Sequence, residues 1–175
     1  YTVIYVAKDS EYKSLKELIV ATQQKPIKIA IPGMGASAHL FAVLLREKAG
    51  LKSTVVQFPA AQQVLAVIAK EVPASTDTAS GVVGDDRVRV LAVGSDHARS
   101  PMFPDVPTTK ELGYPGLEVP YRVGLVGPPG MPADVTKVLV EAMQKALADP
   151  GMKADFEKAK LFLEPMNPDD FKQAN

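Results

Sequence analysis

The stretch KIAIPGMGASAHLFAVLL, residues 28–45, indicates the fold class of this chain. It begins with a short β-branched segment typical of a strand, continues through a turn containing Gly33 and Gly35, and ends in apolar residues at helical spacing. Gly50 predicts the end of that helix, because glycine readily adopts the left-handed conformation that closes many helices. Strand, turn and helix in this order form the repeating unit of an α/β sheet.

The same alternation extends along most of the chain. Further strands are predicted at residues 2–7, 54–58, 88–93 and 119–126, and further helices at residues 14–23, 62–70, 108–113 and 133–147. Three prolines predict an ordered loop at residues 95–107. We therefore expect an α/β protein.

Several helix starts carry capping signals. Ser14 with Glu17, and Thr108 with Glu111, have the spacing of a capping box, in which two side chains satisfy main-chain N–H groups at a helix start. Asn167, followed by a proline and two acids, predicts the start of a last helix.

Composition argues against several classes of protein. Twenty Lys plus Arg balance twenty Asp plus Glu, so nucleic acid is not expected as a partner. The chain has no Cys and two His, so we expect no disulfide, no catalytic thiolate and no metal centre. It has no apolar run long enough to span a membrane. These features predict a protein that uses no cofactor.

The turn before residue 37 is the candidate ligand site. Gly33 and Gly35 allow the backbone to approach a ligand closely. Ala36, Ser37 and Ala38 would then present main-chain N–H groups that lack intrahelical acceptors, and an anion can bind such groups. In the alternative interpretation, Ser37 caps its helix and the glycines form only a tight turn.

The same residues also fit the dinucleotide fingerprint G-x-G-x-x-A. A nucleotide-binding enzyme is therefore a rival interpretation. That fingerprint expects an acid about twenty residues further on, where it binds the ribose. The next predicted strand ends Gln57-Phe58-Pro59 and supplies no acid.

Two other polar residues are candidates for the site. His39 is either a ligand contact or an ordinary helix residue, and Asp77 is either a helix N-cap or an acceptor for a ligand donor. A hydrolase built from Ser37, His39 and Asp77 is not favoured, because Ser37 does not lie in a G-x-S-x-G motif. No catalytic residue is predicted.

Motifs along nearly the whole chain resemble one family. They are SLKEL at residues 14–18, GMGASAHL at 33–40, VLAV at 90–93, RSP at 99–101, PDVPT at 104–108, ELG at 111–113, GLVGPPGMP at 124–132 and ALADP at 146–150. In this order they are similar to the motifs of the tripartite tricarboxylate transporter receptors, also called the Bug family of periplasmic solute-binding proteins.

The resemblance implies a type II-like, Venus-flytrap α/β binding protein that holds its ligand between two lobes. Residues 1–120 would form the second lobe, and residues 121–175 would return to a first lobe whose N-terminal part is expected to precede this chain. The implied protein is a periplasmic monomer that captures a small organic acid, such as a dicarboxylate, for the membrane subunits of a tripartite transporter. It is not an enzyme. The nucleotide-dependent enzyme, and a ligand-free sensor or interaction module, remain alternatives.

The implied ligand-binding residues come from four places. They are Gly33, Met34, Gly35, Ala36, Ser37 and His39 in the turn, Pro59, Ala60 and Ala61 after the third strand, Asp77, and Arg122. The family usually has PYKG where this chain reads FPAAQ at residues 58–62, and often an aromatic residue at the position of Arg122. Arg122 could hold a second carboxylate through two hydrogen bonds, or it could be an exposed strand residue.

Overall fold

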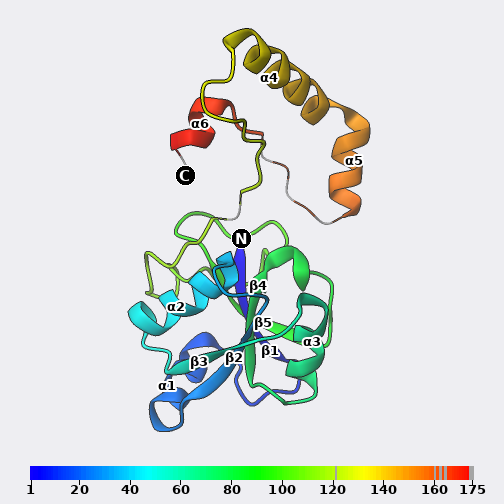
Figure 1. Cartoon of the computed structure of the whole chain (residues 1–175). Coiled ribbons are helices and arrows are strands. Elements are labelled where there is room, and N and C mark those ends of the chain that lie inside the picture. The colour runs from blue at the N-terminus through cyan, green and yellow to red at the C-terminus, as the bar shows by residue number, and fades with distance from the viewer. Residues whose placement is uncertain (121, 160, 162, 164, 174–175) are drawn as a thin grey trace. The chain divides into compact units, whose positions relative to one another are not determined.

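The computed structural model describes residues 1–120, 122–159, 161, 163 and 165–173, and the chain divides into two units. The first unit is Tyr1–Tyr121 and the second is Arg122–Asn175. In the first unit, a sheet has helices on both of its faces (Figure 1).

The elements of the first unit follow the predicted alternation. The strands are β1 (Thr2–Ala7), β2 (Ile27–Ile31), β3 (Ser53–Gln57), β4 (Ala74–Thr78) and β5 (Val88–Gly94). The helices are α1 (Leu15–Gln24), α2 (Ser37–Ala49), α3 (Ala60–Ile68) and the short 3-10 helix η1 (Ala79–Gly81). Gly50 follows α2 in the left-handed conformation, with a φ of 73°, as its position predicts.

The sheet has the strand order β3-β2-β4-β1-β5. β2 is parallel to β3 and β4, whereas β1 is antiparallel to both of its neighbours, β4 and β5. The C-terminal ends of β2, β3, β4 and β5 therefore lie at one edge of the sheet, together with the beginning of β1. We call this edge the carboxyl edge.

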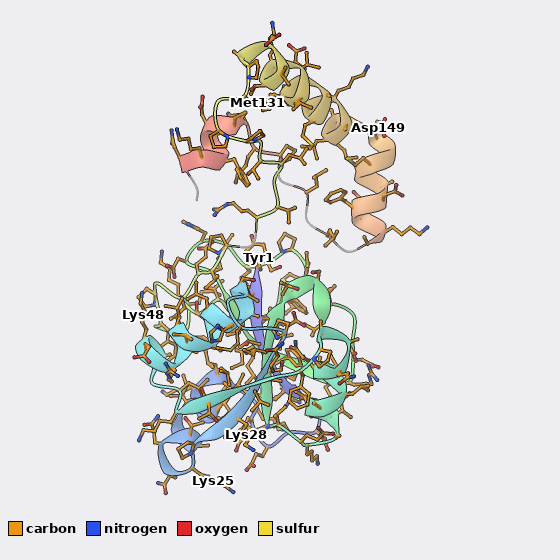
Figure 2. All side chains as sticks on the ribbon, in the orientation of Figure 1. Tyr1, Lys25, Lys28, Lys48, Met131 and Asp149 are labelled. Atoms are coloured by element: carbon orange, nitrogen blue, oxygen red, sulfur yellow. The ribbon has the colours of Figure 1, made fainter. Side chains whose placement is uncertain are left out.

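Side chains alternate between the two faces of the sheet, and each face has its own core. One face packs against α1 and α2, and its buried residues include Ile4, Val6, Ile29, Ile31, Leu18, Phe41 and Leu45. The other face packs against α3, and its buried residues include Val3, Tyr5, Ala30, Ala66 and Val67. Figure 2 shows side chains filling the space between the sheet and the helices. Because these faces are buried, α2 is held on one side of the sheet and α3 on the other. The loops that lead into these two helices therefore leave the carboxyl edge toward opposite faces.

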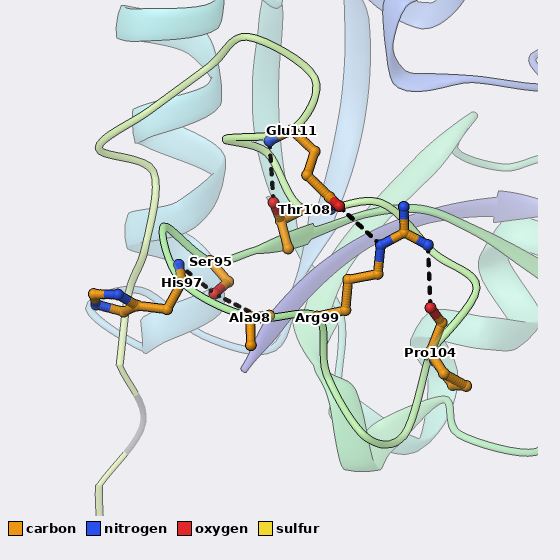
Figure 3. Close-up of polar contacts among 7 residues, drawn as sticks. All are labelled: Ser95, His97, Ala98, Arg99, Pro104, Thr108 and Glu111. Atoms are coloured by element: carbon orange, nitrogen blue, oxygen red, sulfur yellow. Dashed lines mark hydrogen bonds and ion pairs between the residues drawn. The ribbon is translucent and has the colours of Figure 1, made fainter.

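The loop after β5 is ordered, as its prolines predict, by a polar network (Figure 3). The Arg99 Nε donates to both carboxylate oxygens of Glu111 at 3.0 Å, and its Nη1 donates to the Pro104 carbonyl at 3.1 Å. Thr108 and Glu111 make the reciprocal bonds of a capping box, at 2.7 and 3.1 Å. The Thr108 N–H, more than any other group, lowers the pKa of Glu111.

The helix predicted at residues 108–113 is nevertheless wrong, because this segment forms turns. The Leu112 N–H donates to the Thr108 carbonyl at 3.2 Å, but the next donor, the Gly113 N–H, turns back to Lys110. Gly113 has a φ of 89°, which stops the helical conformation after one turn. The capping box of Thr108 and Glu111 therefore stabilises a turn at the end of the loop and does not begin a helix.

The second unit consists of α4 (Ala133–Ala148), α5 (Pro150–Lys158) and α6 (Pro168–Gln173). The Asn167 side chain accepts from the Asp170 N–H at 2.8 Å, which confirms the predicted helix start. None of these helices has a buried residue. Within the described residues, no helix is long and apolar enough to cross a membrane.

The strand predicted at residues 119–126 is not observed. Residue 121 lies outside the described residues, and the remaining positions of the segment form no strand. Val123, Leu125 and Val126 are largely exposed. An apolar, β-branched sequence forms a strand only beside another backbone, and no described segment pairs with this one.

Gly94 provides a test of the packing at the carboxyl edge. A Cβ atom at this position would lie 2.7 Å from both the Phe41 ring and the Thr2 hydroxyl. We predict that Gly94→Ala lowers the free energy of unfolding by about 1–3 kcal/mol in urea titrations, because the buried ring would have to shift. Gly33→Ala is the matched control, since nothing lies within 4 Å of its added Cβ. Equal effects of the two substitutions would contradict the packing described for α2.

Candidate functional site

The glycine turn lies at the carboxyl edge, between β2 and α2. Gly35 has a φ of 81°, a conformation that glycine adopts without strain. Two hydrogen bonds close the turn: the Ala36 N–H donates to the Gly33 carbonyl at 3.3 Å, and the Gly35 N–H donates to His39 Nδ1 at 3.0 Å. The backbone of the turn is therefore held by contacts within the segment itself.

The first turn of α2 has main-chain donors without acceptors. Ala36 occupies the N-cap position and makes no side-chain cap, and the Leu40 N–H is the first to donate within the helix, to the Ala36 carbonyl at 3.0 Å. Among the described residues, no acceptor faces the N–H groups of Ser37, Ala38 and His39. These three donors lie at the positive end of the helix dipole; Ser37 and His39 are half-buried, and Ala38 is buried.

Two details of the predicted turn need correction. Ser37 is the first residue of α2 and not its N-cap, so the alternative in which Ser37 caps the helix is wrong. The Ala36 N–H was expected to be free, but it donates to Gly33 and belongs to the turn. The set of free donors is shifted by one residue, from 36–38 to 37–39.

A similar helix start lies nearby, at the beginning of α3. Pro59 is its N-cap residue and makes no side-chain cap, and Pro59, Ala60 and Ala61 are exposed. Proline has no side-chain acceptor, so the cap position leaves the first amides of α3 uncovered. Both α2 and α3 begin at the carboxyl edge without a side-chain cap.

The sheet topology brings these two helix starts to the place where ligands commonly bind in α/β proteins. From β2 the chain leaves through α2 toward β3, and from β4 it leaves toward β5, on the opposite side. Such a reversal between neighbouring strands opens a crevice beyond their carboxyl ends. β2 and β4 are neighbours here, so the glycine turn lies at the point of reversal.

A hydrogen bond that the sequence did not predict joins β4 to α2. The Thr76 hydroxyl donates to the Ala38 carbonyl at 2.9 Å, and both residues are buried. This bond fixes the first turn of α2 against the sheet.

β4 was not predicted as a strand, because its sequence ASTDT has little apolar character. Ser75, Thr76 and Asp77 are all polar, so the sequence shows no alternation of apolar and polar residues that could have identified this strand.

Asp77 lies near the end of β4 and is 7% exposed. It points to the α3 face, because it is two residues from Ser75, which bonds Gln63 of α3 at 2.8 Å. The Asp77 Oδ1 accepts from the Thr78 N–H at 2.6 Å, and no cationic side chain among the described residues pairs with it. Burial raises the pKa of Asp77, and the Thr78 hydrogen bonds oppose that shift. Asp77 does not cap η1, so its predicted N-cap role is wrong.

The structure brings most, but not all, of the predicted site residues to one edge. The glycine turn, the start of α3 and Asp77 share the carboxyl edge. Met34 is exposed beside the turn. His39 contacts the turn through its own side chain. Arg122 belongs to the second unit, so its contribution stays a prediction.

A shallow groove of about 420 Å³ lies elsewhere, in the second unit. Its lining residues are Ala142, Lys145, Ala146, Asp149 and Met152, from α4, α5 and the link between them. None of these is a candidate site residue. The donors of α2 are the stronger candidate, because they are unsatisfied main-chain groups and the groove offers mainly apolar side-chain atoms.

Comparison with known proteins identifies a family whose model matches the whole chain, and relatives that match most of it. The model of the family described as "Tripartite tricarboxylate transporter family receptor" matches residues 1–175. The chain is 31% identical over 156 residues to the "UPF0065 protein in tcbD-tcbE intergenic region" of Pseudomonas sp., and the match covers 85% of this chain and 46% of that protein. The chain spans about half the length of the curated relatives that it matches.

Solved structures show the same fold. The periplasmic binding protein BugD is 28% identical with a TM-score of 0.71, over 90% of this chain and 55% of that chain. MatC from Rhodopseudomonas palustris, solved with bound malate, is 23% identical with a TM-score of 0.74, over 90% of this chain and 55% of that chain. These similarities confirm the predicted α/β fold of a periplasmic binding protein.

The raised pKa of Asp77 predicts a pH-dependent effect on stability. The Asp77 carboxyl ionises at a lower pH in the unfolded chain than in the folded chain. At a pH above its pKa in the folded chain, ionisation of Asp77 therefore lowers the free energy of unfolding. Asp77→Asn keeps an acceptor for the Thr78 N–H and should raise the free energy of unfolding near neutral pH. The gain should vanish as the pH falls below about 3.9, the ordinary Asp value.

The control is Asp85→Asn, measured in the same urea titrations. The hydrogen bond from Arg87 lowers the pKa of Asp85, so this substitution should have the opposite sign, a loss of stability near neutral pH. A loss of stability in Asp77→Asn near neutral pH would show that the Asp77 carboxylate is favourably placed in the folded chain.

Proposed function

The chain belongs to the tripartite tricarboxylate transporter receptor family, and from this premise we propose that it forms part of a solute-binding receptor for a small organic carboxylate. The observation that carries the proposal is the set of unsatisfied N–H groups at Ser37, Ala38 and His39. A carboxylate has two oxygens, each of which can accept such hydrogen bonds.

The energetics of this site favour an anion. Each hydrogen bond to a charged group contributes about 1.5–3 kcal/mol. The helix dipole adds about 0.3–1 kcal/mol. No acid lies in the first turn of α2. Two or three N–H groups, with the Ser37 hydroxyl as a further donor, therefore favour a bound carboxylate, and this gain is partly offset by the freedom that the ligand loses on binding.

Other residues would complete the site. The amides at the start of α3, after Pro59, provide a second set of donors at the same edge. Asp77 would accept from a hydroxyl or ammonium group of the ligand, and Arg122 would bind a second carboxylate. A dicarboxylate fits this set of groups. The relative MatC, solved with malate, is consistent with that ligand class.

The family also suggests the context in which the site works. We infer that residues 1–120 form one lobe, that residues 121–175 belong to the other, and that the ligand lies between the lobes. The protein would act in the periplasm as a monomer, without catalysis, and would deliver its ligand to the membrane subunits of a tripartite transporter.

The rival nucleotide-dependent enzyme is less well supported. A dinucleotide site needs an acid at the end of the strand that follows the glycine turn. β3 ends at Gln57, with Phe58 and Pro59 after it. The glycine turn thus offers phosphate-binding amides without the group that would bind a ribose.

Ser37 allows a direct test of the proposal. We predict that Ser37→Asp weakens malate binding at least about tenfold, because a like charge would face the ligand at the positive end of the helix. Ser37→Asn is the matched control, with the same shape and no charge, and should bind within about threefold of the original chain. Isothermal titration calorimetry measures both affinities, and thermal unfolding should show both variants folded.

The outcome separates the two candidate functions. Equal malate affinity in the Asp and Asn variants would remove the glycine turn from the carboxylate site. Binding of NAD by the original chain, with no binding of malate or other dicarboxylates, would favour the nucleotide-dependent enzyme instead.

A further inference from the structure

We propose that His39 is a positioning and specificity-determining residue of the carboxylate site. Its imidazole holds the glycine turn in shape and keeps the start of α2 free of negative charge. This inference rests on the proposed function, because it concerns the donors that would bind the carboxylate. It adds a role for the His39 imidazole to the predicted ligand contact of this residue, whose main-chain N–H is one of the donors.

The contact between His39 and the turn defines the state of the imidazole. The Gly35 N–H lies 3.0 Å from His39 Nδ1. A main-chain N–H can only donate, so Nδ1 must accept and must carry no proton. The ring that makes this bond is therefore neutral, with its proton on Nε2. His39 is the third residue of α2, and Gly35 directly precedes the N-cap residue Ala36.

Helix α1 provides an internal comparison. There too, the residue before the N-cap donates its N–H to the side chain of the third helical residue, and we call this contact the brace. The Lys13 N–H donates to the Glu17 carboxylate at 2.8 Å, from the residue before the N-cap to the third residue of the helix. The N-cap Ser14 also accepts from the Glu17 N–H at 3.2 Å. The start of α1 is thus covered by a hydroxyl and charged by an acid.

The two helix starts differ in the two properties that matter for an anion. α1 has an acid as its brace and a serine as its cap, whereas α2 has a neutral imidazole as its brace and an alanine as its cap. An acid near a helix start usually stabilises the helix. At α2 that acid is absent, although the contact joins the same two positions, the residue before the N-cap and the third residue of the helix. α2 begins at the carboxyl edge, and α1 follows β1, which ends at the opposite edge.

Within the described part of the chain, the contact with the turn is the polar contact that positions the His39 imidazole. Among the residues that the structure describes, His39 makes no ion pair, and its one side-chain hydrogen bond is the contact with Gly35. The charged residues Arg46, Glu47 and Lys48 lie at the far end of α2. On its sheet side, the first turn is fixed by the bond from Thr76 to Ala38. His39 and Thr76 therefore hold the donors from two directions.

Three substitutions at residue 39 distinguish the effect of the contact with Gly35 from the effect of charge on malate binding. Glutamine and glutamate are alike in shape, and both can accept from the Gly35 N–H, as side chains at this helix position often do. They differ in charge. His39→Leu removes the acceptor. The probe is malate, followed by the amide chemical shifts of Ser37, Ala38 and residue 39 in NMR titrations, which detect millimolar binding.

We expect a distinct pattern of affinity and stability. His39→Gln should bind malate within about threefold of the original chain. His39→Glu should bind at least about tenfold more weakly while melting at the same or a higher temperature, because the acid stabilises the helix start but repels the ligand. His39→Leu should lower the melting temperature and weaken binding together. In the original chain, imidazole nitrogen shifts should show a proton on Nε2 and none on Nδ1.

The results that overturn the inference differ from those that overturn the proposed function. Equal malate affinity in the Gln and Glu variants would show that charge at residue 39 does not determine specificity. Unchanged binding and melting in His39→Leu would show that the brace does not position the donors. A chain that shifts no amide at residues 37–39 with malate, in any variant, would contradict the carboxylate site itself.

Discussion

Main-chain N–H groups in the first turn of a helix need acceptors, and at α2 no described residue supplies one to Ser37, Ala38 or His39. Ser37, Ala38 and His39 keep free donors because Ala36, at the cap position, has no side-chain acceptor. Most helix starts satisfy these groups with Ser, Thr, Asp or Asn, as α1 does with Ser14. Leaving them open weakens the helix unless an external anion binds. The proposed carboxylate site follows from this constraint.

The fold determines where those donors point. β1 runs antiparallel between β4 and β5, and the other four strands end together at the carboxyl edge. α2 and α3 therefore both begin at this edge, on opposite faces of the sheet. The bond from Thr76 to Ala38 holds α2 at its first turn, and packing of Phe41 holds the rest of the helix. A small displacement of α2 would misdirect all three donors at once.

Local patterns predicted most of the elements and the general position of the site. Gly50, Ser14 and Asn167 mark helix ends whose chemistry is local, so their roles were readable from sequence. Features that depend on distant partners were not readable. β4 is polar but buried because two strands flank it, and the apolar segment at residues 122–126 forms no strand, since none of the described strands lies beside it. The motif likewise could not show that His39 bonds Gly35, since that contact depends on the shape of the turn.

The central claim is that the free donors of α2 bind a carboxylate. Solvent exchange rates of individual amide hydrogens, measured by NMR with and without malate, test it most directly. The account predicts that malate slows exchange at Ser37 and Ala38, where hydrogen bonds to the ligand would form, and leaves the middle of α2 unchanged. Unchanged exchange at these two residues, with slowing at another part of the chain, would contradict the account.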